Sequence, residues 1–223
     1  MSIAINSKFI YPKTIREAIL GHRHYAVGEE KLPSVTTILG ETKDKTFLKE
    51  WKKRVGEQEA EKIKNSASTR GSVMHHILEE HIKGNKHVDM TSIGQRAGVM
   101  ANIIISKGLS KVDLVYGIEA VMHYPGLYAG SADLVGVHEG QDAIMDFKQT
   151  NKPKREEWIE DYFLQLAAYA MAHDYVYGTQ INKGVVMMCS VDSYYQEFIV
   201  EGEKLRYYKH EFLRRLDKYH GTQ

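Results

Sequence analysis

The stretch of sequence that decides the fold is YAGSADLVGVHEGQDAIMDFKQ, residues 128–149. Two apolar runs within it are separated by Glu139-Gly140-Gln141, which is a turn signal. A third run of the same kind precedes them and is closed by Tyr124-Pro125-Gly126. We therefore predict three consecutive strands that form a meander, at residues 112–122, 128–138 and 142–149.

Helical patterns surround this meander. The amphipathic spacing of Phe47, Leu48, Trp51 and Val55 predicts a helix over residues 44–65. A second helix is predicted to start at Ser68 or Thr69 and to run to about Lys83. Further elements follow the same reasoning: helices at 91–107, 156–177 and 202–219, and strands at 184–191 and 194–200.

The order of these elements predicts an α/β fold with a mixed central β-sheet flanked by helices. Before them, the first forty residues have only short extended pieces around His24–Val27 and a short helix that Ser34 could cap. We expect residues 1–67 to be an N-terminal extension with helices, packed on a core of residues 68–223. The absence of GxGxxG and GxxxxGK[ST] from the sequence argues against a nucleotide-binding fold.

Composition limits the possible functions. The chain has 223 residues, a net charge of +1 and one cysteine, Cys189. One cysteine excludes an internal disulfide framework and a cysteine-ligated iron–sulfur cluster. The start has no apolar signal segment, and no apolar run reaches the length of a membrane span. We therefore expect an intracellular protein that is not bound to a membrane.

Two carboxylates stand out in the meander. Asp133 and Asp146 lie on successive predicted strands, each among apolar residues. A buried carboxylate is costly unless it is paired or bound to a metal, and two on adjacent strands would repel each other. A divalent cation between them would remove both costs, so the sequence predicts a metal site.

Strand geometry brings a lysine to the same place. Residues i and i+2 of a strand point to the same face, so Asp146 and Lys148 are neighbours while Phe147 points away. A lysine beside a metal-bound carboxylate can orient or deprotonate a water, or offset charge on a phosphate. Taken alone, this D-x-K triplet is also compatible with a surface ion pair.

Two helical pairs extend the candidate site. His75 and Glu79 are four residues apart on the second predicted helix, so they share a face and could both serve as metal ligands. Gln165 and Tyr169 have the same spacing on the helix after the third strand, where they could contact a phosphate or a strand. The alternatives are a solvated face for the first pair and core packing for Tyr169.

A basic segment follows the third strand. Lys152, Lys154 and Arg155 come after Lys148 with no acid among them. The segment is either a solvated face or a binding surface for phosphates.

These motifs carry a resemblance to a known family. Arg70-Gly-x-x-x-His75, Gly130-x-x-Asp133, Asp146-x-Lys148 and Gln165-x-x-x-Tyr169 occur in this order. The set resembles the PD-(D/E)XK nuclease superfamily in its RecB-like branch, over about residues 68–170. Two further stretches resemble mitochondrial genome maintenance exonucleases and their phage relatives: Pro33-Ser-Val-Thr-Thr-Ile-Leu39 and Asp146-Phe-Lys-Gln-Thr-Asn-Lys-Pro-Lys154.

The resemblance implies a restriction-endonuclease-like core and a role for each matching residue. Asp133 and Asp146 would bind metal together with the carbonyl of Phe147, and Lys148 would be the catalytic lysine. His75 would lie on or near the metal, with Glu79 as an additional acid and Glu119 as an acid behind the ligands. The remaining residues would support the site or bind DNA: Arg70, Gln165, Tyr169, Lys152, Lys154 and Arg155.

The sequence departs from the family pattern in two respects. Ala132 precedes Asp133, so the literal Pro-Asp dipeptide is absent. The single cysteine excludes the iron–sulfur cluster that some members of the branch carry.

The resemblance leads us to expect a Mg²⁺- or Mn²⁺-dependent deoxyribonuclease, preferably an exonuclease, that acts in DNA replication, recombination or repair. Its partner would be DNA with single-stranded character or free ends. A phage-encoded protein that acts in the host cytoplasm fits this expectation. A structure-selective endonuclease and a catalytically inert DNA-binding scaffold remain alternatives. The sequence leaves the oligomeric state open.

Overall fold

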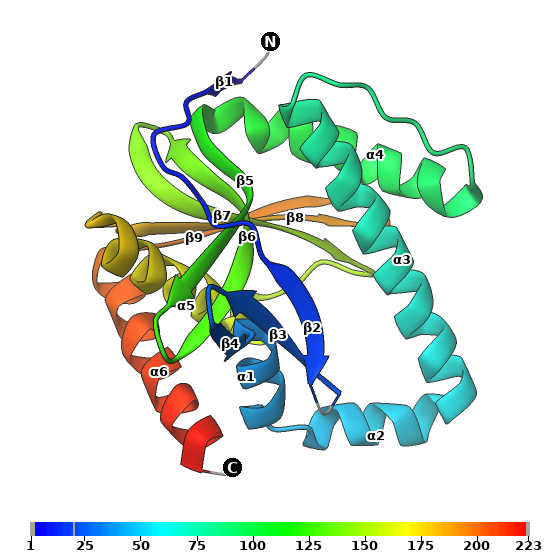
Figure 1. The fold of residues 1–223 in the computed structure, drawn as a ribbon. Coiled ribbons are helices and arrows are strands. Elements are labelled where there is room, and N and C mark those ends of the chain that lie inside the picture. Colours follow the sequence, from blue (N-terminus) through cyan, green and yellow to red (C-terminus); the bar gives the residue numbers. More distant parts are fainter. Residues whose placement is uncertain (1–2, 20, 222–223) are drawn as a thin grey trace.

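The computed structural model describes residues 3–19 and 21–221. Within them, six strands form one mixed sheet in the order β1-β5-β6-β7-β8-β9, and three more form a small antiparallel sheet, β2-β3-β4 (Figure 1). The strands are β1 (Ala4–Ile5), β2 (Ile15–Ile19), β3 (His22–Val27), β4 (Glu30–Pro33), β5 (Val112–Tyr124), β6 (Tyr128–His138), β7 (Gln141–Thr150), β8 (Lys183–Ser190) and β9 (Tyr195–Glu201).

Helices cover both faces of the main sheet (Figure 1). One apolar core lies under α3 and α4, and the other lies under α1, α5 and α6. The predicted mixed sheet flanked by helices is therefore confirmed. The helices are α1 (Val35–Thr42), α2 (Thr46–Val55), α3 (Glu57–Ile82), α4 (Ser92–Lys107), α5 (Glu160–Tyr177) and α6 (Gly202–Gly221), with single 3₁₀ turns at Leu109–Lys111 and Glu156–Trp158.

The predicted meander is present as β5, β6 and β7, which pair antiparallel in sequence order. Glu139 and Gly140 form a two-residue hairpin between His138 and Gln141, and both have positive φ, of 48° and 76°. Two positive φ angles in succession are typical of a type I′ turn, whose twist matches the flanking strands. This turn fixes the register of β6 against β7, and the register places the two candidate carboxylates.

The N-terminal region differs from the prediction in two ways. It has more strand than the short extended pieces expected around His24–Val27, because β1 joins the main sheet beside β5 and β2–β4 form a sheet of their own. The predicted helix over residues 44–65 is divided at Gly56, which has a φ of 85° that favours glycine. Beyond this break α3 runs unbroken through Ser68, where a second helix was expected to start.

The short helix expected after Ser34 is confirmed as α1. The Ser34 side chain accepts a hydrogen bond from the Thr37 amide at 3.0 Å, which satisfies one of the free donors of the first turn. Val35 and Ile38 of this helix are fully buried in the core under α5 and α6. No helix of residues 3–19 or 21–221 has the length and apolar character needed to cross a membrane.

Candidate active site

Strands β6 and β7 separate at one point, which we call the fork. Their pairing ends at Leu134 opposite Met145. From there β6 continues along β5, with one further bridge from Ala129 to Ser34, while β7 continues along β8. Asp133 and Asp146 are the first residues beyond the last pair, and both are buried. The structure thus brings together the two acids that the sequence singled out.

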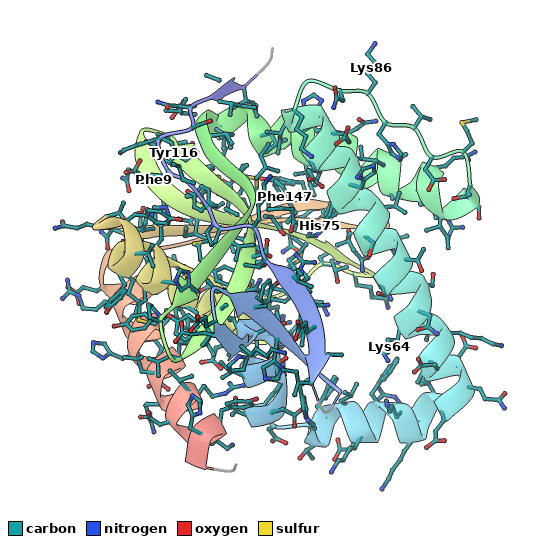
Figure 2. All side chains as sticks on the ribbon, viewed as in Figure 1. Phe9, Lys64, His75, Lys86, Tyr116 and Phe147 are labelled. Carbon is teal, nitrogen blue, oxygen red and sulfur yellow. The ribbon has the colours of Figure 1, made fainter. Side chains whose placement is uncertain are left out.

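Asp133 is tied to the neighbouring strand and to α3. Its Oδ2 accepts a hydrogen bond of 2.7 Å from the Phe147 amide, and its Oδ1 lies 3.3 Å from Nδ1 of His75. His75 of α3 and Phe147 of β7 lie next to each other, with ring centroids 6.1 Å apart (Figure 2). Burial favours protonation of Asp133, but His75, Lys148 and the Phe147 amide outweigh it and lower its pKa below the ordinary value. Asp133 is therefore held as a carboxylate.

Asp146 and Lys148 lie on the same face of β7, as strand parity predicted. The Lys148 ammonium forms an ion pair with Oδ2 of Asp146 and lies 4.9 Å from the centre of the Tyr162 ring. Burial favours the neutral amine of Lys148, but Asp146 and Asp133 outweigh it and raise its pKa. Lys148 therefore enters the site as a cation.

Asp146 itself is in an unfavourable environment. Burial raises its pKa to about 6, Lys148 opposes this effect, and the charge of Asp133 reinforces it. Among the described residues, Oδ2 of Asp146 has no hydrogen-bond partner beyond its ion pair with Lys148. A buried carboxylate with spare acceptor capacity next to a second carboxylate is suited to a cation.

Gln165 and Tyr169 approach the same acids from α5. Gln165 Nε2 donates to Oδ1 of Asp146 at 3.1 Å and to the Tyr169 hydroxyl at 3.3 Å. Gly130 makes room for this tyrosine, since a Cβ at that position would lie 2.5 Å from Cε1 of Tyr169. The glycine of Gly130-x-x-Asp133 is therefore required for packing, and the glutamine orients a carboxylate of the site.

Glu119 lies closer to the acids than the sequence suggested. Single ligand atoms of His75, Glu119 and Asp133 lie within 4.8 Å of one another. One imidazole and two carboxylates fit a divalent cation such as Mg²⁺ or Mn²⁺. Glu119 has a φ of 47°, which is unusual for a non-glycine residue inside a strand. Such backbone geometry has no local sequence signature, so Glu119 could not be ranked as a ligand in advance.

Two predicted site residues have other partners in the structure. Glu79 forms an ion pair of 2.7 Å with Lys83 and is not part of the group of His75, Glu119 and Asp133. Arg70 is buried, and its guanidinium donates to the side chains of Gln149 and Asn151. Arg70 thus ties α3 to the end of β7, and its predicted contact with phosphate stays a prediction.

The predicted basic segment follows the end of β7. Lys152 and Arg155 are exposed, whereas Lys154 is half-buried and its backbone is held by Gln196. The Arg155 guanidinium lies 5.3 Å from the centre of the exposed Trp158 ring. Arg155 also forms an ion pair of 3.8 Å with Glu157, and the contact of this segment with phosphates stays a prediction.

A cavity of about 190 Å³ opens beside the fork. It is lined by the candidate residues His75, Asp133, Asp146 and Lys148 and also by Arg16 and Arg23, which sequence reasoning missed. A second cavity of about 540 Å³ shares Arg16, Arg23, His75 and Glu119 with it and extends along α3. The acids are thus accessible from one side, between the small sheet and α3.

No protein-family model matches the chain. Proteins named mitochondrial genome maintenance exonuclease 1 are similar to it. The one from Xenopus tropicalis is 26% identical over 219 residues, 92% of this chain and 61% of its own length. The human one is 29% identical over 205 residues, 84% of this chain and 58% of its own length.

These relatives, together with the ordered motifs, confirm the predicted resemblance to PD-(D/E)XK nucleases. The chain spans about three fifths of the length of the curated relatives it matches. Two solved structures show a distant likeness. The structure of SSO0001 has a TM-score of 0.45 at 14% identity and covers 89% of this chain and 79% of that one. A candidate exonuclease from Eubacterium rectale has a TM-score of 0.44 at 12% identity, with 70% and 68% covered.

Proposed function

We propose that this chain is a divalent-cation-dependent nuclease that hydrolyses phosphodiester bonds of DNA, and that it acts as an exonuclease. The observation that supports this most is the fork, where Asp133 and Asp146 are buried, Lys148 is ion-paired with Asp146, and all three residues line an open cavity. The names of the relatives favour an exonuclease over an endonuclease.

His75, Glu119 and Asp133, whose ligand atoms lie within 4.8 Å of one another, would hold the cation, with Asp146 and the Phe147 carbonyl as further ligands. A bound Mg²⁺ or Mn²⁺ would supply a water of lowered pKa and positive charge for the phosphate. The Lys148 ammonium is placed to orient that water and to offset charge on the phosphate. Gln165 holds Asp146 in position through its hydrogen bond of 3.1 Å.

The surrounding groups would bind the rest of the strand. Lys152, Lys154 and Arg155 follow β7 directly and would contact flanking phosphates, which gives an affinity that falls as salt rises. Arg70 would act on this segment through Asn151. The intracellular, phage-like context expected from the sequence stays a prediction.

The experiment follows radiolabel placed in turn at each end of single- and double-stranded DNA, with Mg²⁺, Mn²⁺ or a chelator. We expect cleavage from an end that requires the cation. Asp146→Asn should reduce it by roughly a thousandfold or more, because the substitution removes a ligand while preserving the side-chain shape. Asp142→Asn on the same strand is the control, since Asp142 lies away from the fork and bonds Tyr116.

Three results would change the proposal. Full activity in Asp146→Asn would exclude the assigned site. Cutting of a closed single-stranded circle would favour the structure-selective endonuclease. Cation-independent DNA binding without any cleavage by the wild-type chain would favour the inert DNA-binding scaffold.

A further inference from the structure

The small sheet presents two arginines to the fork. Arg16 of β2 lies opposite Tyr25 of β3, and Arg23 lies opposite Ala18. Since directly opposed residues and residues two apart share a face of a sheet, Arg16, Arg23 and Tyr25 point to the same side. Tyr25 on this side is buried against Ala129 of β6, and both arginines line the cavity at the fork.

Arg16 is already bound to an acid of the site. Its guanidinium donates to Oε2 of Glu119 at 3.1 Å, and the Ser131 hydroxyl donates to the same oxygen at 2.9 Å. Glu119 has an unusual φ of 47°, and non-glycine residues in such costly conformations cluster at functional sites. Arg16 thus supplies positive charge to the same carboxylate that lies within ligand distance of His75 and Asp133.

The Arg16–Glu119 pair is easy to break. The side chains of Arg16 and Glu119 are 52% and 37% exposed. Ion pairs with this much exposure contribute little stability, so a divalent cation held by several carboxylates could displace the arginine. The released guanidinium would remain in the cavity, with a planar set of donors that matches a phosphate.

We propose that Arg16 is an exchangeable partner of Glu119: it holds this carboxylate in the cation-free protein and moves to a phosphate of the nucleic-acid strand when the cation binds. This inference rests on the proposed nuclease function. Arg16 would then be a positioning residue with opposite effects on two events. It would weaken the binding of the cation, because it competes for Glu119, and it would assist the binding of the nucleic-acid strand.

Arg23 provides the contrast. It faces the same two cavities, but in the described part of the chain its guanidinium forms no hydrogen bond or ion pair. Arg23 could therefore bind phosphate without first breaking an ion pair with a carboxylate. Its removal should weaken the binding of DNA and leave the affinity for the cation unchanged.

The test measures both events on Arg16→Gln. In calorimetric titration with Mn²⁺ and no DNA, the variant should bind Mn²⁺ about fivefold more tightly than the wild-type protein. The reason is that an ion pair of about 1 kcal/mol, which competes with the cation for Glu119, is lost. Cleavage of end-labelled DNA at saturating Mn²⁺ should instead fall by about tenfold or more in kcat/KM. Arg16→Lys should restore the wild-type Mn²⁺ affinity but only part of the cleavage, since an ammonium lacks the planar fork.

Lys31→Gln is the matched control. Lys31 is a half-exposed cation on the opposite face of the same small sheet, paired with Glu17 at 2.9 Å. Neither measurement should change in this variant. Thermal melting of all variants establishes that each is folded under the assay conditions.

These outcomes test the exchange of Arg16 between Glu119 and phosphate separately from the proposed nuclease function. Unchanged or weaker Mn²⁺ binding by Arg16→Gln overturns the exchange, even if the wild-type protein cleaves DNA. Absence of Mn²⁺ binding by the wild-type protein also overturns the exchange, because no cation then replaces Arg16 as the partner of Glu119. Tighter Mn²⁺ binding by Arg16→Gln with no cleavage by the wild-type protein or any variant would support competition between Arg16 and the cation. The same result would refute the proposed nuclease function.

Discussion

Two clusters of charged groups lie on the main sheet, and they differ in the balance between acids and cations. At the fork, Asp133, Asp146 and the adjacent Glu119 share the cations Lys148 and Arg16 and the imidazole of His75. The second cluster, which we call the Glu197 cluster, consists of Glu197 with Lys111, His138 and Tyr195. Glu197 forms an ion pair with Lys111, accepts a hydrogen bond of 3.0 Å from Tyr195 and lies 3.6 Å from His138.

The carboxylates of the two clusters respond in opposite ways. Burial disfavours the charge of Glu197, but its donors outweigh burial and lower its pKa to about 2. Burial and Asp133 together raise the pKa of Asp146 to about 6, despite the ion pair with Lys148. The comparison indicates that a carboxylate whose charge is fully balanced by hydrogen-bond donors and cations stabilises the fold. A site where carboxylates outnumber the cations that balance them is suited to bind a metal cation.

The largest expected effect comes from Lys148→Met. Cleavage should fall by roughly 10²–10³-fold, because the ammonium that faces the reacting phosphate is lost. Without cations the variant should also melt at a lower temperature, since Asp146 is left buried and unpaired. Mn²⁺ should recover this loss of stability. Lys111→Met in the Glu197 cluster is the comparison, and recovery by Mn²⁺ in that variant would contradict our distinction.

Next in size is the stabilisation of the wild-type protein by the cation alone. At a free Mn²⁺ concentration of 100 times Kd, binding should add about 2.7 kcal/mol to the free energy of unfolding. Denaturant unfolding with and without Mn²⁺ measures this difference. The increase should vanish in Asp133→Asn and persist in Glu197→Gln. The reverse pattern would show that the cation binds in the Glu197 cluster and not at the fork.

Glu197→Gln should lower stability by about 2 kcal/mol. Breaking a buried ion pair costs about 3–5 kcal/mol, and the partial exposure of Lys111 reduces this figure. Asp146→Asn, measured in the same cation-free buffer by urea unfolding, should cost less than this, because the repelled charge that it removes offsets the loss of the ion pair with Lys148. A large loss of stability in Asp146→Asn would show that the fork is architectural after all.

A further expected effect is the dependence of stability on pH without cations. The folded-state pKa of Asp146 is raised from 3.8 to about 6, so its contribution to stability is lost as pH rises through this window. The folded-state pKa of Glu197 is lowered from 4.5 to about 2, so its contribution is lost as pH falls through that window. Difference curves between the wild-type protein and each amide variant should therefore slope in opposite directions.

The sequence predicted the elements that local signals define. The meander follows from turn residues and from strands that are apolar along their length, and the fork acids follow from charge within those strands. The order of His75, Asp133, Asp146, Lys148 and Gln165 on their elements also agrees with the structure. In each case the information lies within a few residues or in a motif.

What the sequence did not predict depends on contacts between distant segments. Strands β2 and β3 contain half-exposed residues and pair only with each other and β4, so they carry no clear alternating pattern. Ser68 resembles a helix cap, but in α3 it lies mid-helix and its carbonyl accepts from Ser72. Arg16 and Glu119 are 103 residues apart in sequence, and only the small sheet brings them together.

The amide of Phe147 has a consequence for spectroscopy. At the fork its hydrogen-bond acceptor is a carboxylate oxygen of Asp133 rather than a carbonyl of β6. Any change in the charge or position of this carboxylate therefore alters the environment of one backbone proton. The chemical shift and hydrogen-exchange rate of that amide form a built-in reporter, which distinguishes the empty, cation-loaded and DNA-bound protein without an added label.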